Sequence, residues 1–279
     1  MSNRIETDRD LCARPLVIGG TGGSGTRLLV AIAQAAGYFM GEFRPFADFK
    51  GDMWMNDGFD SEEFIDFAWR WRERLIAAGE EPLAEPEMEA AIGELRAAVE
   101  RHRQFLPGDA KWGWKLPQSV LCLPVIDRLF PDLRFIHMIR DGREMAFSRN
   151  QNDAAAFGEF IFARQGPDAM PAAYMSEETR MASLSIIVWG FANALAADYG
   201  ESQMGSRYLR VDYGQLCAEP GPGLRKLLEF MEVAPDLAAD IGNLVQPSRS
   251  IGRWHQQGRP AQDAVNRFGG EFLKRLGYG

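Results

Sequence analysis

The amino-acid sequence predicts an α/β fold with three αβα layers, in which a central parallel sheet lies between two layers of helices. Three short apolar runs indicate strands, at Leu16–Ile18, Leu133–Ile139 and Tyr208–Val211, and Lys111–Lys115 is a weaker candidate. Long stretches with helical character separate these runs. Strands that alternate with helices in this way favour a parallel sheet with helices on both of its faces.

The predicted helices differ in how much apolar surface they offer. Glu62–Ala78 is amphipathic, since Phe64, Phe67 and Trp71 recur at helical spacing, whereas Glu85–Phe105 is charged and reads as exposed. Glu177–Tyr199 is mostly apolar, so we expect it to be central. The other predicted helices are Leu28–Ala36, Leu121–Phe130, Leu224–Val233 and Asp263–Leu276. The irregular, aromatic-rich segment Phe39–Gly58 is either functional or a packed connecting loop.

The composition is that of an ordinary globular protein. The 279 residues are 46% hydrophobic and 25% charged, and they contain neither an internal repeat nor a linker. We therefore expect one domain over residues 1–279, with residues 1–14 as a flexible N-terminal extension. The formal net charge of -8 argues against non-specific nucleic-acid binding, which needs Lys and Arg to neutralise phosphates.

The polar N-terminus and the lack of a long apolar run indicate a cytoplasmic chain. The first ten residues are polar and lack the apolar core of a signal peptide. No apolar run approaches the roughly 20 residues of a membrane-spanning helix, so an integral membrane protein is not expected. Cys12, Cys122 and Cys217 are too few and too far apart for a disulfide framework, and we expect buried, reduced thiols.

A glycine-rich loop lies between the first predicted strand and the first predicted helix. Gly19–Arg27 reads GGTGGSGTR, and its glycines allow successive backbone N–H groups to turn inward, beside the positive end of the helix dipole. This is chemistry for holding a phosphate or sulfate, and it predicts a P-loop NTPase-like fold. The Lys-Ser/Thr pair of a Walker A motif is absent, since Thr26 and Arg27 follow Gly25. The binding candidates are Gly22, Gly23, Ser24, Gly25, Thr26 and Arg27.

A second motif begins in a strand and runs into a helix. In Phe135–Ser148, Arg140 stands at the carboxyl end of the strand, where doubly wound sheets bind ligands, and Ser148 is expected in the following helix. A guanidinium offers a planar, permanently charged fork for a phosphate, and a hydroxyl can donate one further bond.

Together the two motifs resemble the nucleotide-binding signature of the PAPS-dependent sulfotransferases, especially the bacterial and carbohydrate-directed branches. The resemblance implies that Gly22–Arg27 holds the 5′-phosphosulfate, while Arg140 and Ser148 hold the 3′-phosphate. Ser250–Trp254 is similar to a late loop that closes over the 3′-phosphate side, which adds Arg253. The implied reaction moves a sulfuryl group from PAPS to a hydroxyl or amine acceptor and releases 3′,5′-ADP.

The chain departs from the family pattern at two positions. Many members carry Lys or Arg where Gly23 stands, so the charge that offsets the leaving phosphate must come from Arg27 or Lys115. Lys115 lies in Trp112–Pro117, which resembles the Lys-then-Pro segment beside the acceptor. Cytosolic members place a catalytic His there, and this chain has none.

The base that activates the acceptor is therefore sought among carboxylates. Glu42 stands where several sulfotransferases outside the cytosolic branch place a catalytic Glu, and Asp48 follows in the same loop; Glu42 is preferred. His137 reads as a strand or core residue and His102 as solvent-exposed, while His255 could approach the nucleotide. The motifs require no metal.

Two other functions stay open. A P-loop kinase that lacks its Walker Lys would need ATP and Mg²⁺. A non-catalytic nucleotide-binding module would bind without transfer. The partner expected for the sulfotransferase is a small-molecule, glycan or lipid acceptor, and a homodimer is compatible with the sequence.

Overall fold

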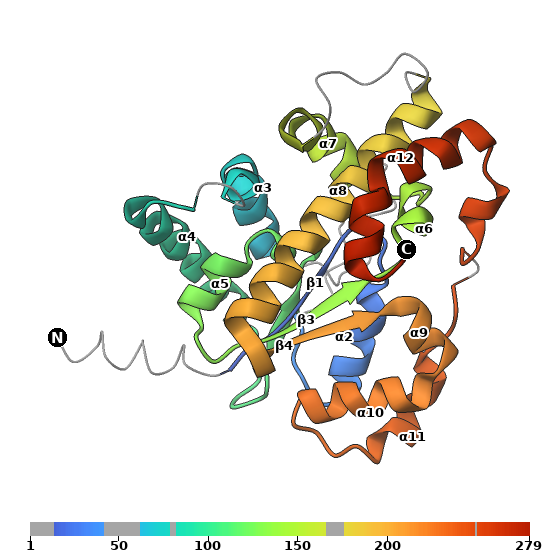
Figure 1. The fold of residues 1–279 in the computed structure, drawn as a ribbon. Coiled ribbons are helices and arrows are strands. Elements are labelled where there is room, and N and C mark those ends of the chain that lie inside the picture. The colour runs from blue at the N-terminus through green and yellow to red at the C-terminus, as the bar shows by residue number, and fades with distance from the viewer. Residues whose placement is uncertain (1–13, 42–61, 79–81, 166–175, 249) are drawn as a thin grey trace, which may run out of the picture.

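Four parallel strands form the centre of the molecule (Figure 1). The computed structural model describes residues 14–41, 62–78, 82–165, 176–248 and 250–279. The strands are β1 (Leu16–Gly20), β2 (Gly113–Lys115), β3 (Arg134–Ile139) and β4 (Tyr208–Asp212), in the order β2-β1-β3-β4. All four predicted strands are confirmed, including the weaker candidate before Leu116. Residues 1–13 of the predicted N-terminal extension and residues 42–58 of the irregular segment lie outside the described residues.

The strand order places a switch point at β1. Leu16 pairs with Gly113 of β2 on one side and with Arg134 of β3 on the other, and every pairing is parallel. The chain thus leaves β1 for one neighbour and later crosses to the opposite side. In open α/β sheets, ligands bind outside the carboxyl ends of the strands at such a point.

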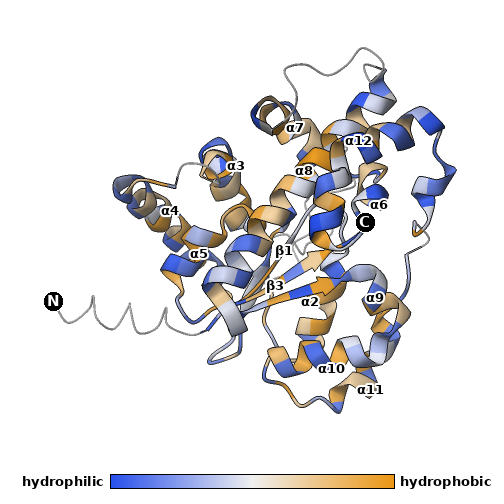
Figure 2. Ribbon diagram, in the orientation of Figure 1, coloured by the Kyte–Doolittle hydropathy of each residue, from blue (hydrophilic) through white to orange (hydrophobic). Residues whose placement is uncertain are grey.

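The first helical layer covers the face of the sheet that carries Val17, Phe135 and Ile139, whose side chains are buried in one large apolar cluster. Its central helix is α8 (Glu177–Tyr199), which packs against α12 (Arg259–Leu276) and α7 (Asn152–Gln165). In Figure 2, hydrophobic residues colour much of α8. The other helices on this side are α3 (Glu62–Ala77), α4 (Glu85–Arg103), α5 (Leu123–Leu129) and the short α6 (Gly142–Ala146).

The second layer covers the opposite face, which carries Leu16, Ile18, Ile136 and Met138. Alternate residues of β1 and β3 thus point into different apolar clusters, as a strand that is buried on both faces requires. This layer consists of α2 (Thr26–Ala35), α9 (Tyr213–Ala218), α10 (Pro220–Phe230) and α11 (Leu237–Ile241). The predicted three-layer arrangement is confirmed. Short helical turns lie between these elements: η1 (Pro117–Val120), η3 (Gly200–Met204), η4 (Gly205–Arg207), η5 (Gly242–Leu244) and η6 (Arg253–Gln256).

No apolar stretch as long as a membrane-spanning helix was expected from the sequence, and the central helix corrects this expectation. Within the described residues, one helical stretch, Thr179–Arg207, is long and apolar enough to cross a membrane by length and composition. However, 83% of its most apolar window is buried inside the protein. A core helix of an α/β protein passes the same test, so this stretch is weak support for a membrane span.

Three local expectations were wrong. His102 is buried rather than exposed, because it lies on the inner face of α4 and its Nε2 bonds the carbonyl of Gly113 at 2.9 Å. Ser148 lies beyond the end of α6 rather than in it. Cys217 is only half-buried, whereas Cys122 is buried as expected. The helices α7, α9 and α11 were not predicted, since each is short or, like α7, has weak apolar periodicity.

Candidate functional site

A cavity of about 400 Å³ opens at the carboxyl ends of β1, β2 and β3. Its wall brings together residues that lie up to 231 positions apart in the sequence, from Gly22 to Arg253. It is lined by Gly22, Gly23, Gly25, Thr26, Arg27, Leu28, Lys115, Pro117, Arg140, Ser148, Arg149, Asn150, Tyr213, Ser248, Ser250 and Arg253. The cavity therefore occupies the place that the strand order predicts for a ligand.

The glycine loop, residues 21–25 between β1 and α2, owes its shape to two left-handed residues. Gly23 has φ +94° and Gly25 has φ +99°, values that side-chain-bearing residues rarely adopt. Space is short as well, because a Cβ on Gly25 would stand 2.4 Å from the ring of Tyr213. The loop directly precedes the first turn of α2, whose free N–H groups and dipole attract anions.

Ser24 is buried and does not line the cavity. Its backbone N–H donates to the carbonyl of Thr21 at 3.0 Å and closes the turn of the loop. Its side chain is fully buried, and the hydroxyl has no hydrogen-bond partner among the described residues. Ser24 is thus not a lining residue, whereas the other predicted binding residues line the cavity: Gly22, Gly23, Gly25, Thr26 and Arg27.

Arg140 is held from several sides at the carboxyl end of β3. Its side chain is only 8% exposed, and Nη2 donates to Ser250 Oγ at 2.9 Å. The guanidinium carbon lies 5.0 Å from the ring centroid of Tyr213. The indole of Trp189 donates to the Arg140 carbonyl at 2.9 Å and so fixes the backbone. Because Arg140 Nε is buried without a partner among the described residues, donor capacity is left for a ligand.

A buried carboxylate joins Arg140 to the late loop, residues 250–254. Glu144 Oε2 lies 3.8 Å from Arg140 and 4.0 Å from Arg253, and Oε1 accepts the Gly252 N–H at 2.7 Å. Arg253 also donates to the carbonyl of Phe147 at 2.9 Å. We call Arg140, Glu144 and Arg253 the arginine cluster. Two guanidiniums share one carboxylate, so the cluster keeps a net positive charge toward the cavity.

Lys115 brings a further cation to the cavity from the end of β2. The residue is only 3% exposed. Burial, together with the nearby charge of Arg27, lowers the pKa of Lys115 to about 7. A lysine in this state gains and loses its proton near neutral pH, and a bound anion would favour its charged form.

Several cavity residues were missed by sequence reasoning. The ring of Tyr213 packs between Gly25 and Arg140, and its hydroxyl accepts the Ser248 N–H at 3.2 Å. Tyr213 directly follows β4, so its position at the carboxyl end of a predicted strand could have identified it as a site residue. Ser248 offered no such signal, because its position depends on a bond to Tyr213 across 35 residues. Ser250 lay in the predicted late loop, but its bond to Arg140 spans 110 residues. Glu144, beside the cavity, accepts from Gly252 across 108 residues.

The two predicted base candidates, Glu42 and Asp48, lie outside the described residues. Among the described histidines, His137 lies in the core as predicted: Nε2 bonds Asn193 at 2.8 Å and Nδ1 bonds Tyr208 at 2.6 Å. His255 is exposed and does not line the cavity. In the described part of the chain, no group of His, Cys, Asp and Glu side chains could hold a metal ion.

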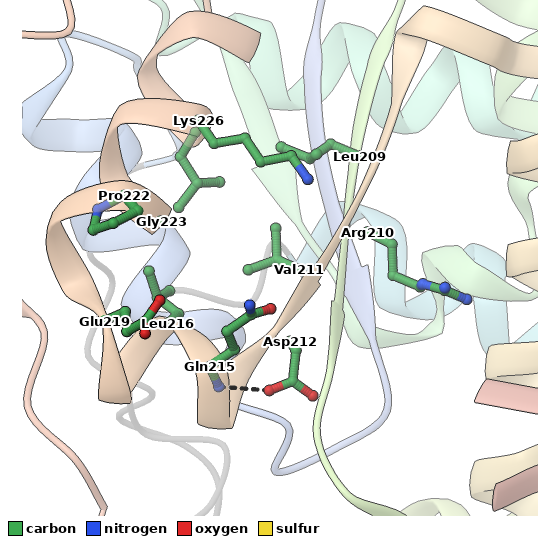
Figure 3. A pocket seen from close by; sticks show the side chains of 11 residues that line it. Leu209, Arg210, Val211, Asp212, Gln215, Leu216, Glu219, Pro222, Gly223 and Lys226 are labelled. Carbon is green, nitrogen blue, oxygen red and sulfur yellow. Dashed lines mark hydrogen bonds between the residues drawn. The ribbon is translucent and has the colours of Figure 1, made fainter. Parts of the chain in front are cut away.

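A second, smaller cavity of about 170 Å³ lies between β4 and α10 (Figure 3). Its wall is mainly apolar, with Leu209, Val211 and Leu216, and Lys226 extends across it. Asp212, its acidic group beside β4, already accepts the Gln215 N–H at 2.6 Å and caps α9. This cavity has neither a glycine loop nor an arginine cluster, so the larger one is the candidate site.

The larger cavity suits a ligand that carries two anionic groups. One part, the glycine loop, offers backbone N–H groups and the start of a helix. The other part, the arginine cluster with Ser148, offers charged and hydroxyl side chains. These are the two general ways in which proteins hold phosphates and sulfates.

Comparisons with known proteins agree with this arrangement. Residues 15–236 match the family model described as the sulfotransferase family. No curated protein matches the chain.

Solved structures share the fold at low sequence identity. A sulfotransferase from Mycobacterium avium is 14% identical, with a TM-score of 0.58 over 98% of this chain and 80% of that one. A sulfotransferase from Alicyclobacillus acidocaldarius is 15% identical, with a TM-score of 0.53 over 95% of this chain and 94% of that one. The sulfotransferase domain of a Synechococcus PCC 7002 olefin synthase is 13% identical, with a TM-score of 0.50 over 95% and 94%. These similarities confirm the predicted P-loop NTPase-like fold class.

Proposed function

The chain belongs to the sulfotransferase family, and we propose that it takes its sulfuryl group from PAPS, passes it to a hydroxyl or amine acceptor and releases 3′,5′-ADP. One observation carries the choice of donor. A single cavity combines an anion-binding glycine loop with a second, separate anion site built around Arg140. PAPS is a nucleotide with an anionic group on each side of its ribose, so it needs both sites at once.

The 3′-phosphate is assigned to Arg140 and Ser148, with Arg253 beside them. Arg140 is buried and has an unused Nε donor, and Ser148 lines the same wall. Charge-assisted hydrogen bonds of this kind are stronger than neutral ones. Arg149, which is exposed on the rim of the cavity, adds a further positive charge.

The phosphosulfate is assigned to the glycine loop and Lys115. Loop N–H groups and the first turn of α2 hold the 5′-phosphate, and Lys115 and Arg27 offset the negative charge that grows on it as the sulfuryl group departs. PAPS supplies an activated sulfuryl group with 3′,5′-ADP as leaving group. Because Lys115 is buried, its interaction with that charge is little screened by water.

A carboxylate, Glu42 or Asp48, is proposed to take the proton of the acceptor. Proton removal by a positioned base makes a hydroxyl a better nucleophile. No metal takes part in the proposal, and the acceptor is of the small-molecule, glycan or lipid class.

Turnover with labelled donor tests the proposal. The purified chain is incubated with ³⁵S-labelled PAPS and a panel of phenols, sugars, lipid alcohols and amines, with and without EDTA. Transfer of label that resists EDTA, with formation of 3′,5′-ADP, is expected. Phosphate transfer from ATP that requires Mg²⁺, without any use of PAPS, would contradict the proposal and favour a kinase.

A further inference from the structure

One N–H group of the glycine loop is bound by the protein itself. The Gly22 N–H donates to Asp153 Oδ2 at 2.9 Å, although the two residues are 131 positions apart. Asp153 stands in the first turn of α7. Loops of this kind usually present their N–H groups to the ligand. A carboxylate at this position therefore calls for an explanation.

The same carboxylate has a second partner. Asp153 Oδ1 accepts a hydrogen bond from Gln118 Nε2 at 2.7 Å. Gln118 lies in η1, three residues after Lys115, in the segment that leads away from β2. Asp153 thus joins two segments that line the cavity, the glycine loop through Gly22 and the Lys115 segment through Gln118.

The sequence of the loop fits this contact. A Cβ on residue 22 would stand 3.0 Å from Asp153 Oδ2 and 3.1 Å from the amide nitrogen of Asn150. Glycine at this position lets α7 approach the loop closely enough to bond it. Burial raises the pKa of Asp153, while its two hydrogen bonds oppose that effect by favouring the charged form.

We propose that Asp153 is a positioning residue: its carboxylate ties the glycine loop to the Lys115 segment and so shapes the loop for the 5′-phosphate of the nucleotide. A loop that is already held in its binding conformation loses less conformational entropy when the ligand arrives. The carboxylate touches neither phosphate in this role. The inference rests on the proposed function, because it assumes that the loop holds the 5′-phosphate.

The affinities for two ligands distinguish an effect on the glycine loop from an effect on the arginine cluster. 3′,5′-ADP uses both, whereas adenosine 3′-phosphate lacks the 5′-phosphate and depends on the arginine cluster. Asp153→Ala should weaken 3′,5′-ADP binding about tenfold and change adenosine 3′-phosphate binding less than twofold, measured by calorimetry. The affinities of Asp153→Asn for both ligands should stay within about threefold of the wild-type values. The Asn amide oxygen can accept from the Gly22 N–H, and Gln118 can turn its own amide to accept from the Asn amide nitrogen.

Matched controls separate positioning from general stability. Asp127 also bridges two elements through both of its oxygens, to Tyr199 at 3.0 Å and Arg207 at 2.5 Å, but remote from the cavity. Asp127→Ala should lower the melting temperature and leave both affinities unchanged. If Asp153→Ala does not fold, Gln118→Ala removes one of the two hydrogen bonds of Asp153. This variant should weaken the binding of 3′,5′-ADP about threefold and leave the binding of adenosine 3′-phosphate unchanged.

The outcomes decide between the two proposals. Equal weakening of both ligands by Asp153→Ala, no weakening, or an Asp153→Asn variant as weak as Asp153→Ala would overturn the positioning role alone. A wild-type protein that binds neither ligand would overturn the proposed function, and the positioning role with it.

Discussion

The glycine loop and the arginine cluster, the two proposed anion sites, offer different kinds of binding group. The loop offers backbone N–H groups: two glycines in left-handed conformations turn the chain, and the N-terminus of α2 adds the positive end of its helix dipole. The cluster works through side chains, in which Arg140 and Arg253 share the carboxylate of Glu144. Tyr213 lies between the two and touches both.

This difference determines which changes each part tolerates. At Gly25 of the loop, adding even one methyl group meets both a backbone angle that residues with a Cβ rarely adopt and the ring of Tyr213. In the cluster, the backbone is ordinary and the loss of one charged group is what matters. The predictions below concern the loop, the cluster, and then Lys115 and Tyr213 beside them.

The largest effect is expected from Gly25→Ala. A left-handed conformation costs a residue with a Cβ about 1–2 kcal/mol, and the methyl group would also displace the ring of Tyr213. Calorimetry should show affinity for 3′,5′-ADP reduced about a hundredfold. Gly37→Ala is the control, since Gly37 has φ +86° but no neighbour within 4 Å of a new Cβ. A hundredfold loss in that control as well would show that backbone strain alone, and not the loop, explains the result.

Removing the charge of the cluster should have the next largest effect. Arg140→Ala takes away a buried guanidinium, and hydrogen bonds to charged groups contribute about 1.5–3 kcal/mol each. We expect 3′,5′-ADP to bind about thirtyfold more weakly, and 5′-AMP to bind as in wild type. Arg207→Ala, which removes a guanidinium paired with Asp127 instead, should leave both unchanged. Unchanged 3′,5′-ADP affinity in Arg140→Ala would remove Arg140 from the site.

Lys115 should make nucleotide binding depend on pH. Its pKa of about 7 lies below the unfolded value of 10.5, so the folded protein holds fewer protons in that interval and gains stability as pH rises through it. A bound anion favours the charged lysine, so binding takes up a proton. Affinity for 3′,5′-ADP should therefore fall about tenfold between pH 7 and 9. Lys115→Met should give a flat profile over this range, and a slope that persists in the variant would assign the effect to another group.

The smallest effect is expected at the contact between the two parts. Tyr213→Phe removes the hydroxyl that accepts the Ser248 N–H but keeps the ring against Gly25 and Arg140. A neutral hydrogen bond contributes about 0.5–1.5 kcal/mol, so 3′,5′-ADP affinity should fall about threefold. Tyr38→Phe loses a comparable bond, to the carbonyl of Met231, away from the cavity and should change the melting temperature only. A tenfold or greater loss in Tyr213→Phe would mean that the hydroxyl contacts the ligand.

The fold was predictable because its signals are local. The strands are short apolar runs flanked by turn residues, and the glycine loop stands between a strand and a helix. The same local signals identified Arg140 at the end of a strand. The four strands and the helical layers were therefore predicted from the sequence, and the resemblance of the two motifs to the sulfotransferase signature predicted the family.

The remainder of the site depends on contacts between distant residues. Ser250 accepts a bond from Arg140 across 110 positions, and nothing in the local pattern of either segment indicates the pairing. Asp153 reads as an ordinary acidic residue until α7, which the sequence did not predict, is packed beside the glycine loop. His102 was misjudged for the same reason: the charged outer face of α4 is visible in the sequence, but which partner its inner face meets is not.

The central claim is that one cavity binds a nucleotide through two separate anion sites. The most direct test is a calorimetric titration of the wild-type chain with 3′,5′-ADP, 5′-AMP, and ATP in the presence of Mg²⁺. We predict that 3′,5′-ADP binds at least tenfold more tightly than 5′-AMP, because it alone of the two engages the arginine cluster. Equal affinities for 3′,5′-ADP and 5′-AMP, or a preference for ATP with Mg²⁺, would contradict the claim.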